Sequence, residues 1–360
     1  MPSAPTGTYA SLGCEVNTLS PEALYAHYER SRFLYPEKKA RLTPCLPLIL
    51  QNWRRMWDAG EALQRVVTCR SPHGGLAAMT MWCSTGTCWH AQHLVNSGPP
   101  QAARAVMLAA QAETMREGRI DILQTWFRPD HPYAARTFRT IGQVLPPGTS
   151  SVIPGDYLMV PLTVACSLAT PQDRAVSAVR EITGGEHSPA LVSLASRTRG
   201  NLYAHAEALA EDDLLLESVD RLYRPAGLRR RRRIWVQPAP GGGLSAAALA
   251  YEGPLGLNLS FLENRLDLLI DPALGSVHAA RTVRTLLSRA CAAYKSFPPA
   301  AIPVMTDGIT GRFLRASGAE PVAPYSQAIW HANGYGAWYR HIEDLYRRLR
   351  DSAERHGDGP

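Results

Sequence analysis

The sequence predicts an α/β protein of two tandem units, each a mixed twisted sheet flanked by helices. Three observations lead to this prediction: the length of the chain, a block that occurs twice, and the order of apolar segments after each copy. A chain of 360 residues, 45% of them hydrophobic, suits two domains better than one. We place the domains at residues 1–165 and 166–360, because Pro146, Pro147 and Gly148 open a stretch that interrupts the periodic segments.

The repeated block is a turn between two apolar runs. Residues 71–79 read SPHGGLAAM, and 168 residues later 239–247 read APGGGLSAA. A Pro-Gly-Gly turn between such runs predicts a β-hairpin. Upstream, the Leu-Tyr-Ala-His of residues 24–27 recurs at 202–205. We therefore expect both copies to begin with a helix and a hairpin.

The segments after each hairpin correspond in the same order. The first copy predicts a strand ending at His93-Leu94-Val95, then a helix over 100–117, a strand over 120–127 and a short helix in 131–142. The second copy predicts the same elements at 268–270, 276–295, 302–305 and 307–318. Each short helix is expected to end at a glycine, Gly142 or Gly318. Met159–Cys166 is the expected closing strand of the first copy, with sharing between the two copies as the alternative.

This order of elements resembles the GNAT superfamily of N-acyltransferases, whose late motif is commonly N-x-x-A-x-x-x-Y-x-x-x-G-F. That spacing is occupied in the first copy by His131, Ala134, Phe138 and Gly142, and in the second by Asp307, Thr310, Leu314 and Gly318. The resemblance implies a transferase that moves an acyl group to an amine acceptor, either a small molecule or a peptide. The implied donor is acyl-CoA, used as a co-substrate, or an acyl-carrier protein.

The same resemblance implies where the donor would bind. The expected cofactor-binding residues lie around the loop that follows the central strand of each copy: Val95, Asn96, Gly98, Arg104, Leu269, Ile270, Gly275, Ser276 and Arg281. Neither loop keeps the family's full glycine-rich signature, and prolines in the first remove amide donors. Asp271 adds a negative charge to the second loop. Two alternatives therefore stay open: an aminoacyl-tRNA-dependent ligase of tandem type, and an inactive pair that serves as a binding or scaffold protein.

The second copy is the expected catalytic unit, because its hairpin region is richer in polar residues. A general base in this scaffold is a carboxylate on the central strands, so we predict Glu252 and Glu263. Tyr325, in the strand after the late motif, is the predicted general acid. The competing interpretation is a solvated strand face for the two glutamates and ordinary packing for the tyrosine.

Residues 83–93 contain four side chains of zinc-ligand type: Cys83, Cys88, His90 and His93. The intervening Ser-Thr-Gly-Thr reads as a hairpin turn, which would place the two cysteines opposite each other on adjacent strands. Alternation along the strand would point the two histidines to opposite faces. We expect hairpin packing and no metal, with zinc or a redox-linked cysteine pair as the alternatives.

The charge balance and the cysteine content indicate the kind of partner and the cellular compartment. The net charge is +7 and the positive residues are nearly all arginine, a balance that suits anionic partners such as an acidic carrier protein or tRNA. The run Arg229–Arg233 is either a basic strand edge or a phosphate or RNA contact. Seven scattered cysteines, the lack of a signal-peptide pattern and the lack of a long apolar run predict a cytoplasmic protein without a membrane partner. The last segment, from Trp338, predicts an amphipathic helix packed on the second unit.

Overall fold

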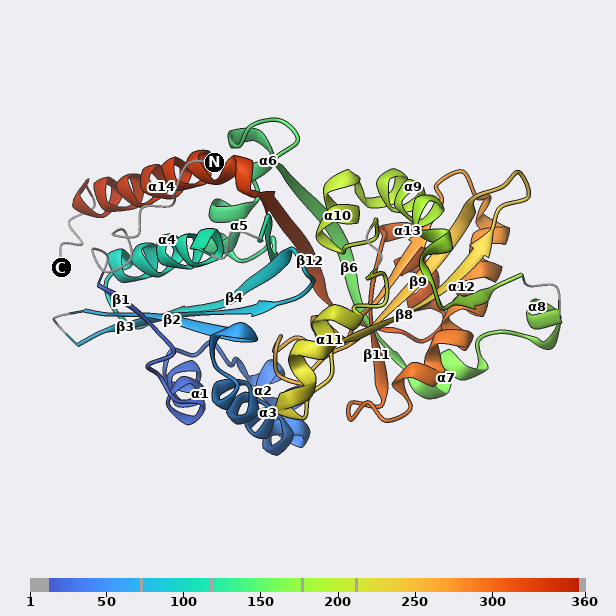
Figure 1. Ribbon diagram of the computed structural model, residues 1–360, viewed down its shortest axis with the longest axis horizontal. Coiled ribbons are helices and arrows are strands. Elements are labelled where there is room, and N and C mark those ends of the chain that lie inside the picture. Colours follow the sequence, from blue (N-terminus) through green and yellow to red (C-terminus); the bar gives the residue numbers. More distant parts are fainter. Residues whose placement is uncertain (1–12, 72–73, 117–119, 176–177, 211–212, 356–360) are drawn as a thin grey trace. The chain divides into compact units, whose positions relative to one another are not determined.

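The structure is a computed structural model that describes residues 13–71, 74–116, 120–175, 178–210 and 213–355. It divides into two compact units (Figure 1). Unit 1 comprises residues 1–35, 56–152 and 327–360, and unit 2 comprises 36–55 and 153–326. The extreme N-terminus, Pro72 of the repeated block and the expected helix end at residue 117 lie outside the described residues.

Unit 1 is a mixed sheet with helices packed on it. Its elements in chain order are β1 (Cys14–Val16), α1 (Pro21–Arg30), β2 (Gln64–Arg70), β3 (Leu76–Cys83), β4 (Cys88–Asn96), α4 (Pro100–Arg116), β5 (Ile122–Phe127), α5 (Pro132–Phe138), α6 (Ile141–Val144) and α14 (Tyr335–Arg355). The strand order is β1-β2-β3-β4-β5, followed by the C-terminal part of β12 (Glu320–His331). Strands β4 and β5 are parallel, whereas the pairs β1–β2, β2–β3 and β3–β4 are antiparallel.

Unit 2 repeats this plan with additional helices. Its elements are α2 (Pro36–Leu42), α3 (Leu46–Asp58, as far as Arg55), β6 (Ser150–Pro161, from Ile153), α7 (Leu162–Ser167), α8 (Pro171–Ala175), β7 (Arg180–Ile182), α9 (Ser188–Arg199), α10 (Asn201–Ala206), α11 (Glu217–Tyr223), β8 (Arg231–Pro238), β9 (Leu244–Glu252), β10 (Leu266–Ile270), α12 (Ser276–Ala290), the 3-10 helix η7 (Cys291–Tyr294), β11 (Ala301–Thr306) and α13 (Gly308–Ala316). The strand order is β6-β11-β10-β9-β8-β7. The mixed α/β class expected from the sequence is confirmed.

The two predicted hairpins are equivalent in their hydrogen bonds. In β2–β3, Ser71 N–H donates to the Gly75 carbonyl and Gly74 N–H to the Ser71 carbonyl. In β8–β9, residues Ala239, Gly243 and Gly242 make the same two bonds. Gly74 and Gly242 both have φ of +93°, a backbone conformation that glycine adopts without steric cost.

Each unit is completed by a strand from the other half of the sequence. In unit 2, residues Asp156 to Pro161 of β6 pair antiparallel with β11, although β6 follows the first copy of the repeat. In unit 1, β5 is flanked by β12, which follows the second copy. The compact units are therefore interleaved along the chain, and the boundary expected after residue 165 stays a prediction about the two copies.

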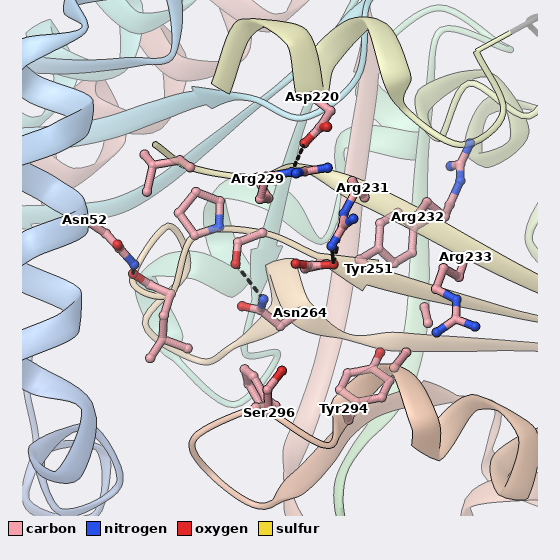
Figure 2. Close-up of a pocket in the computed structure, with 18 of the residues that line it drawn as sticks. Asn52, Asp220, Arg229, Arg231, Arg232, Arg233, Tyr251, Asn264, Tyr294 and Ser296 are labelled. Carbon is pink, nitrogen blue, oxygen red and sulfur yellow. Dashed lines mark hydrogen bonds and ion pairs between the residues drawn. The ribbon is translucent and has the colours of Figure 1, made fainter. Parts of the chain in front are cut away.

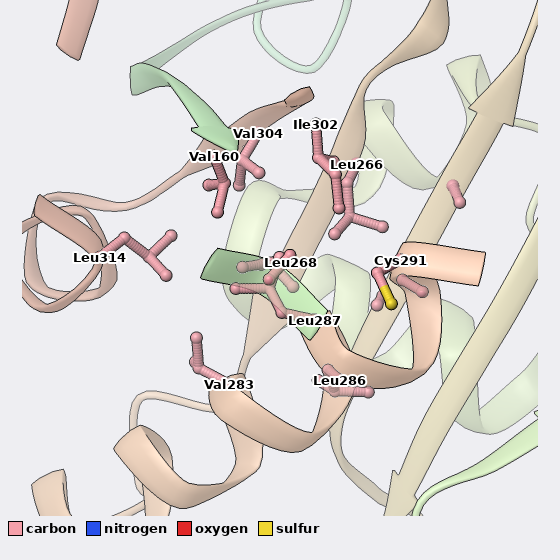
Figure 3. Close-up of a cluster of buried hydrophobic side chains, with 14 of the residues drawn as sticks. Val160, Leu266, Leu268, Val283, Leu286, Leu287, Cys291, Ile302, Val304 and Leu314 are labelled. Atoms are coloured by element: carbon pink, nitrogen blue, oxygen red, sulfur yellow. The ribbon is translucent and has the colours of Figure 1, made fainter. Parts of the chain in front are cut away.

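The core of unit 2 lies between its sheet and α12 (Figure 3). Ala246, Ala248 and Ala250 of β9 face this core together with Leu268 and Leu286. The intervening residues of β9 are also buried, on the opposite face where α9 packs. Burial on both faces explains why β9 reads as a continuous apolar run instead of an alternating one.

Four expected boundaries were wrong or incomplete. Gly142 lies inside α6, because a second helical turn starts at Ile141; Gly318, with φ of +96°, does follow the end of α13. The closing strand of the first copy begins earlier and ends at Pro161, since its partner β11 begins at Ala301, and residues 162–167 form α7. The helix starting at Ser276 is α-helical to Ala290 and then continues as η7.

The C-terminal amphipathic helix exists, but it packs in unit 1 and not on the second unit as expected. The Tyr346 hydroxyl lies 2.7 Å from the Tyr133 hydroxyl, and Tyr339 donates to the Leu108 carbonyl at 2.9 Å. Strand β12 leads the chain into unit 1 before α14 begins. Among the described residues, no helix combines the length and apolar character needed to cross a membrane.

Candidate functional site

In both units the two parallel strands separate after a short paired stretch. β4 and β5 pair at Cys88–Ile122, Trp89–Leu123 and His90–Gln124. β10 and β11 pair at Leu266–Val304 and Asp267–Met305. In the described registers, the carboxyl-terminal parts of these strands carry no further pairing with each other. We call these places the unit-1 divergence and the unit-2 divergence; each exposes backbone groups that a regular ladder would use.

The unit-1 divergence is bridged by a side chain of its own. Gln92 Nε2 donates to Thr125 Oγ1 at 3.0 Å and to the Trp126 carbonyl at 3.1 Å. Gln92 is buried, and next to it His93 has φ of +59°, where the register of β3 and β4 shifts. The bond from Gln92 therefore occupies acceptors on β5 that a ligand in this divergence would need.

The loop after β4 also uses most of its amides internally. Gly98 N–H donates to Asn96 Oδ1 at 2.9 Å, Ser97 N–H to the Leu76 carbonyl and Ala102 N–H to the Pro99 carbonyl. Residues 99 and 100 are prolines without N–H groups. The first helical position of α4 thus offers no donor, and this loop is a poor anion cradle.

Gly98 is further confined by the hairpin. A Cβ on Gly75 would lie 2.2 Å from Gly98 Cα. Of the other expected unit-1 cofactor residues, Val95 is buried, and Arg104 Nε donates to Glu343 Oε2 at 3.0 Å. The structure thus places Val95, Asn96 and Gly98 around one loop, with the Arg104 guanidinium engaged by α14.

The loop after β10 is arranged differently. Asp271 accepts from Arg197 Nη2 at 2.7 Å and from Ala273 N–H at 2.9 Å, and these contacts lower its pKa. Its charge therefore faces a guanidinium. Gly275 precedes α12, and over the described residues no side chain caps the first turn of this helix. The first amides of a helix have no acceptor within the helix itself, and in α12 these amides begin at Ser276.

Two exposed apolar side chains flank this end of unit 2. Val277 in the first turn of α12 is 74% exposed, and Ile309 in the first turn of α13 is 69% exposed. The Asp307 side chain caps α13 by accepting from the amides of Ile309 and Thr310. Of the remaining expected cofactor residues, Leu269 and Ile270 are buried in β10, and Arg281 lies 3.3 Å from Asp173.

The three predicted catalytic residues lie in different surroundings. Glu252, at the end of β9, is about half exposed and pairs with Arg231 at 2.5 Å. Glu263 has no exposed surface and pairs with Arg230, also fully buried, at 2.6 Å. Tyr325 in β12 is 9% exposed, and its hydroxyl lies 3.0 Å from Ser260 Oγ. No hydrogen bond or ion pair joins Glu252 to Tyr325, both of which the structure describes.

The arginine run alternates between the inside and the outside of unit 2. Arg230 and Arg232 are buried, whereas Arg229, Arg231 and Arg233 are exposed. The three exposed arginines pair with Asp220, Glu252 and Glu181. A period of two is the signature of a strand. The last three residues of the run, Arg231 to Arg233, therefore form the start of β8, and the run's exposed arginines are engaged by the chain's own carboxylates.

Four arginines of the run, all except Arg230, line a pocket of about 800 Å³ that lies within unit 2 (Figure 2). The described lining residues come from α3, β8, β9 and the segment after α12, among other parts of unit 2. They include amides, hydroxyls and apolar side chains, and guanidinium groups outnumber carboxylates among them. Asn52 on α3 donates to the Leu255 carbonyl at 3.0 Å, and Arg55 donates to the Gly227 carbonyl at 3.3 Å. Arg55 thus faces an uncharged acceptor, so the wall keeps a net positive charge.

A buried polar network lies between this pocket and the unit-2 divergence. Arg265 binds Glu207 at 2.8 Å and Asp267 at 3.0 Å, Tyr203 donates to Asp267 at 2.7 Å, and Tyr251 donates to Glu207 at 2.7 Å. Burial raises the pKa of Tyr251 well above its ordinary value, which keeps the phenol protonated as a donor. The alternation of Arg265 and Asp267 with leucines is the sequence signal for this network, but neither the network nor the role of Glu207 was predicted from the sequence.

The hairpin predicted after Cys83 exists, but its two cysteines are not opposite each other. Cys83 pairs with Trp89 across the ladder. The Cys83 thiol donates to the Thr85 carbonyl and the Cys88 thiol to the Trp89 carbonyl, so the two point to different acceptors. Within the described part of the chain, no three His, Cys, Asp or Glu side chains come together as a metal site.

Comparisons with known proteins give structural neighbours only. No protein-family model and no curated protein matches the sequence. A protein of Pyrococcus horikoshii with a provisional acetyltransferase name has a TM-score of 0.41 and 7% identity, over 90% of this chain and 91% of that one. A GCN5-related N-acetyltransferase from Kribbella flavida has a TM-score of 0.30 and 10% identity, over 87% and 71%. Saccharomyces cerevisiae N-myristoyltransferase with bound myristoyl-CoA has a TM-score of 0.34 and 12% identity, over 78% and 69%.

Two of these neighbours carry acetyltransferase names, and the third is an N-myristoyltransferase. Because the TM-scores lie below 0.5, no residue role is transferred from them to this chain.

Proposed function

We propose that this protein is a tandem N-acyltransferase that moves an acyl group from acyl-CoA to an amine, with the donor held at the unit-2 divergence. The observation that carries the proposal is the contrast between the units at the carboxyl ends of their parallel strands. In unit 1 Gln92 bridges the strands and the loop amides bond internally. In unit 2 the strands separate after Asp267 and lead to the uncapped first turn of α12.

The donor's phosphates would bind at the first turn of α12. Free amides and the helix dipole attract anions there. Arg197 neutralises Asp271, which removes the main electrostatic objection to an anion at this loop. The exposed Val277 and Ile309 would contact the apolar part of the donor. Gly275 and Ser276 would then contribute backbone groups to the donor site.

The chemistry would be direct attack of the amine nitrogen on the thioester carbonyl. A carbon–nitrogen bond forms, the carbon–sulfur bond breaks, the CoA thiolate leaves and the amine loses one proton. Backbone N–H groups exposed by the separated strands would stabilise the oxyanion. Tyr325, hydrogen-bonded to Ser260, is the proposed proton donor to the thiolate. Glu252 is the better proposed base than Glu263, because Glu263 is fully buried in an ion pair.

A charge substitution in the first turn of α12 tests the donor site. Val277→Asp stabilises a helix N-terminus but repels phosphate, so its effects on folding and on binding have opposite signs. We expect isothermal titration with CoA to show a Kd raised about tenfold, corresponding to about 1.4 kcal/mol. The melting temperature should not fall. Val277→Asn is the matched control, because it also removes the apolar contact but adds no charge, and its Kd for CoA should rise much less than that of Val277→Asp.

Unchanged CoA binding by Val277→Asp would show that the donor does not bind at the first turn of α12. Stabilisation by acetyl-CoA or longer acyl-CoAs in a thermal-shift screen would then have to come from somewhere else in the chain. Failure of every CoA species to bind would reject the acyl-CoA proposal itself.

A binding protein without acyl-transfer activity is the second candidate, and the arginine-lined pocket favours it. The pocket is large enough for a small molecule, and its excess of guanidinium groups favours an anion. Binding of a small organic anion that Val277→Asp leaves unchanged would support this candidate. The arginine run gives the tRNA-dependent alternative less support than the sequence suggested, because its exposed arginines pair with Asp220, Glu252 and Glu181.

A further inference from the structure

Two cysteines far apart in the sequence meet in unit 2. Cys166 lies on α7 and Cys291 opens η7, 125 residues later. Their sulfur atoms are 2.8 Å apart. We propose that Cys166 and Cys291 form a reversible disulfide, which makes this pair a redox modification site of the protein.

The surroundings of the two thiols favour closure of the bond. A disulfide needs a sulfur separation of about 2.05 Å, so an approach of less than 1 Å completes it. α7 packs against both α12 and η7, so the two segments are already held together. Cys291 belongs to the buried core, as Figure 3 shows, whereas Cys166 is exposed to solvent. An oxidant can therefore reach Cys166 directly, and the buried Cys291 lies next to it, where it can close the disulfide.

The other cysteines are placed less favourably. Cys14 and Cys69 face each other across β1 and β2, but both are buried, and burial with the neighbouring Cys69 raises the pKa of Cys14 to about 12. Since the thiolate is the reactive form, that pair resists oxidation. Cys83 and Cys88 donate to separate carbonyl groups. Oxidation is thus selective for the pair in unit 2.

The reaction balances with a low-molecular-weight disulfide such as oxidised glutathione. The Cys166 thiolate attacks one glutathione sulfur, the glutathione disulfide bond breaks, and the first glutathione thiolate leaves. The Cys291 thiolate then attacks Cys166 Sγ in the mixed disulfide and expels the second glutathione thiolate. The two cysteines lose two protons and two electrons, and one oxidised glutathione becomes two reduced molecules.

The new bond would fix one wall of the arginine-lined pocket. The residues directly after Cys291 supply that wall: Ala292, Ala293, Tyr294, Ser296, Phe297 and Pro298. In the reduced protein this segment is held by non-covalent packing between α12 and β11. In the oxidised protein it is tied to α7. This inference does not depend on the proposed acyltransferase activity.

The test uses the full chain equilibrated in glutathione redox buffers. We expect peptide mapping under non-reducing conditions to find a Cys166–Cys291 cross-link that disappears with excess reduced glutathione. After oxidation, two of the seven cysteines should no longer react with a thiol reagent in denaturant. A bond that closes so long a loop should raise the melting temperature by about 10 °C. Cys166→Ala should abolish the cross-link and the temperature shift, while Cys14→Ala should keep both.

Three results would overturn the proposal. One is the absence of the cross-link at every glutathione ratio, and another is a cross-link between different cysteines. The third is a stable glutathione adduct on Cys166 that never closes onto Cys291. A cross-link that lowers the melting temperature would show that closure strains unit 2, and would contradict the fit inferred from the sulfur positions.

Discussion

Removing the negative charge of Glu263 should destabilise unit 2 far more than removing that of Glu252. Both carboxylates pair with neighbouring arginines of the run, Glu263 with Arg230 and Glu252 with Arg231. The first pair is fully buried, whereas the side chains of the second are 51% and 45% exposed. The perturbations are Glu263→Gln and Glu252→Gln, which keep the size of the side chain.

The expected magnitude follows from burial. Breaking one partner of a buried pair leaves a buried charge without compensation and costs about 3–5 kcal/mol. Arg230 would keep its bond to the Glu263 carbonyl at 3.0 Å, so we expect the lower end, about 3 kcal/mol. An exposed pair contributes about 0–1 kcal/mol. For a unit of this size, the melting temperature should fall by about 6–12 °C for Glu263→Gln and by less than about 4 °C for Glu252→Gln.

Urea unfolding followed by circular dichroism, together with calorimetry, measures both variants. The double substitution Arg230→Met with Glu263→Leu removes both charges and should recover most of the loss. Equal stability of Glu263→Gln and Glu252→Gln would refute the inference that burial decides the role of each carboxylate. If Glu263→Gln kept its stability but lost acyl transfer, the sequence-based prediction of Glu263 as a base would be restored.

Three further outcomes follow from the structure. Gly75→Ala should destabilise unit 1 by about 1–3 kcal/mol in urea unfolding, because the new Cβ would overlap Gly98; unchanged stability would mean that this contact yields freely. The Arg284 guanidinium holds the pKa of Asp173 well below its usual range. The contribution of this ion pair to the stability of the fold is therefore complete above about pH 4 and is lost as the pH falls further. Asp173→Asn should therefore reduce the slope of stability against pH below pH 4, and an unaltered slope would contradict the pairing. Tyr325→Phe should lower kcat with little change in KM if this hydroxyl protonates the leaving thiolate, and unchanged kcat would exclude that role.

Local chemistry explains which elements could be predicted. The Ser71 and Ala239 turns, and the cap that Asp307 places on α13, depend on hydrogen bonds within about five residues. The sequence of such a segment largely determines its geometry. For the same reason the strand before Gly98 and the helix after it were located to within a few residues.

The site was less predictable, because its residues are joined across the fold. Glu263 was expected to face a substrate, yet Arg230, 33 residues earlier, binds it in the interior. No sequence pattern pointed to Gln92. Its amide gains a role only because β4 and β5 separate, which lets it bridge the two strands by donating to Thr125. The Cys166–Cys291 approach likewise depends on how α7 packs against η7.

By itself, the sequence determined the α/β class, the hairpins and most helix starts, because these follow from the spacing of apolar residues and from short-range hydrogen bonds. Only the tertiary structure decided that β6 completes unit 2 and that β12 leads α14 into unit 1. It also decided which charges of the arginine run are buried. Strand partners and ion pairs are chosen by the burial of whole faces, a free energy that no single segment carries in its own sequence.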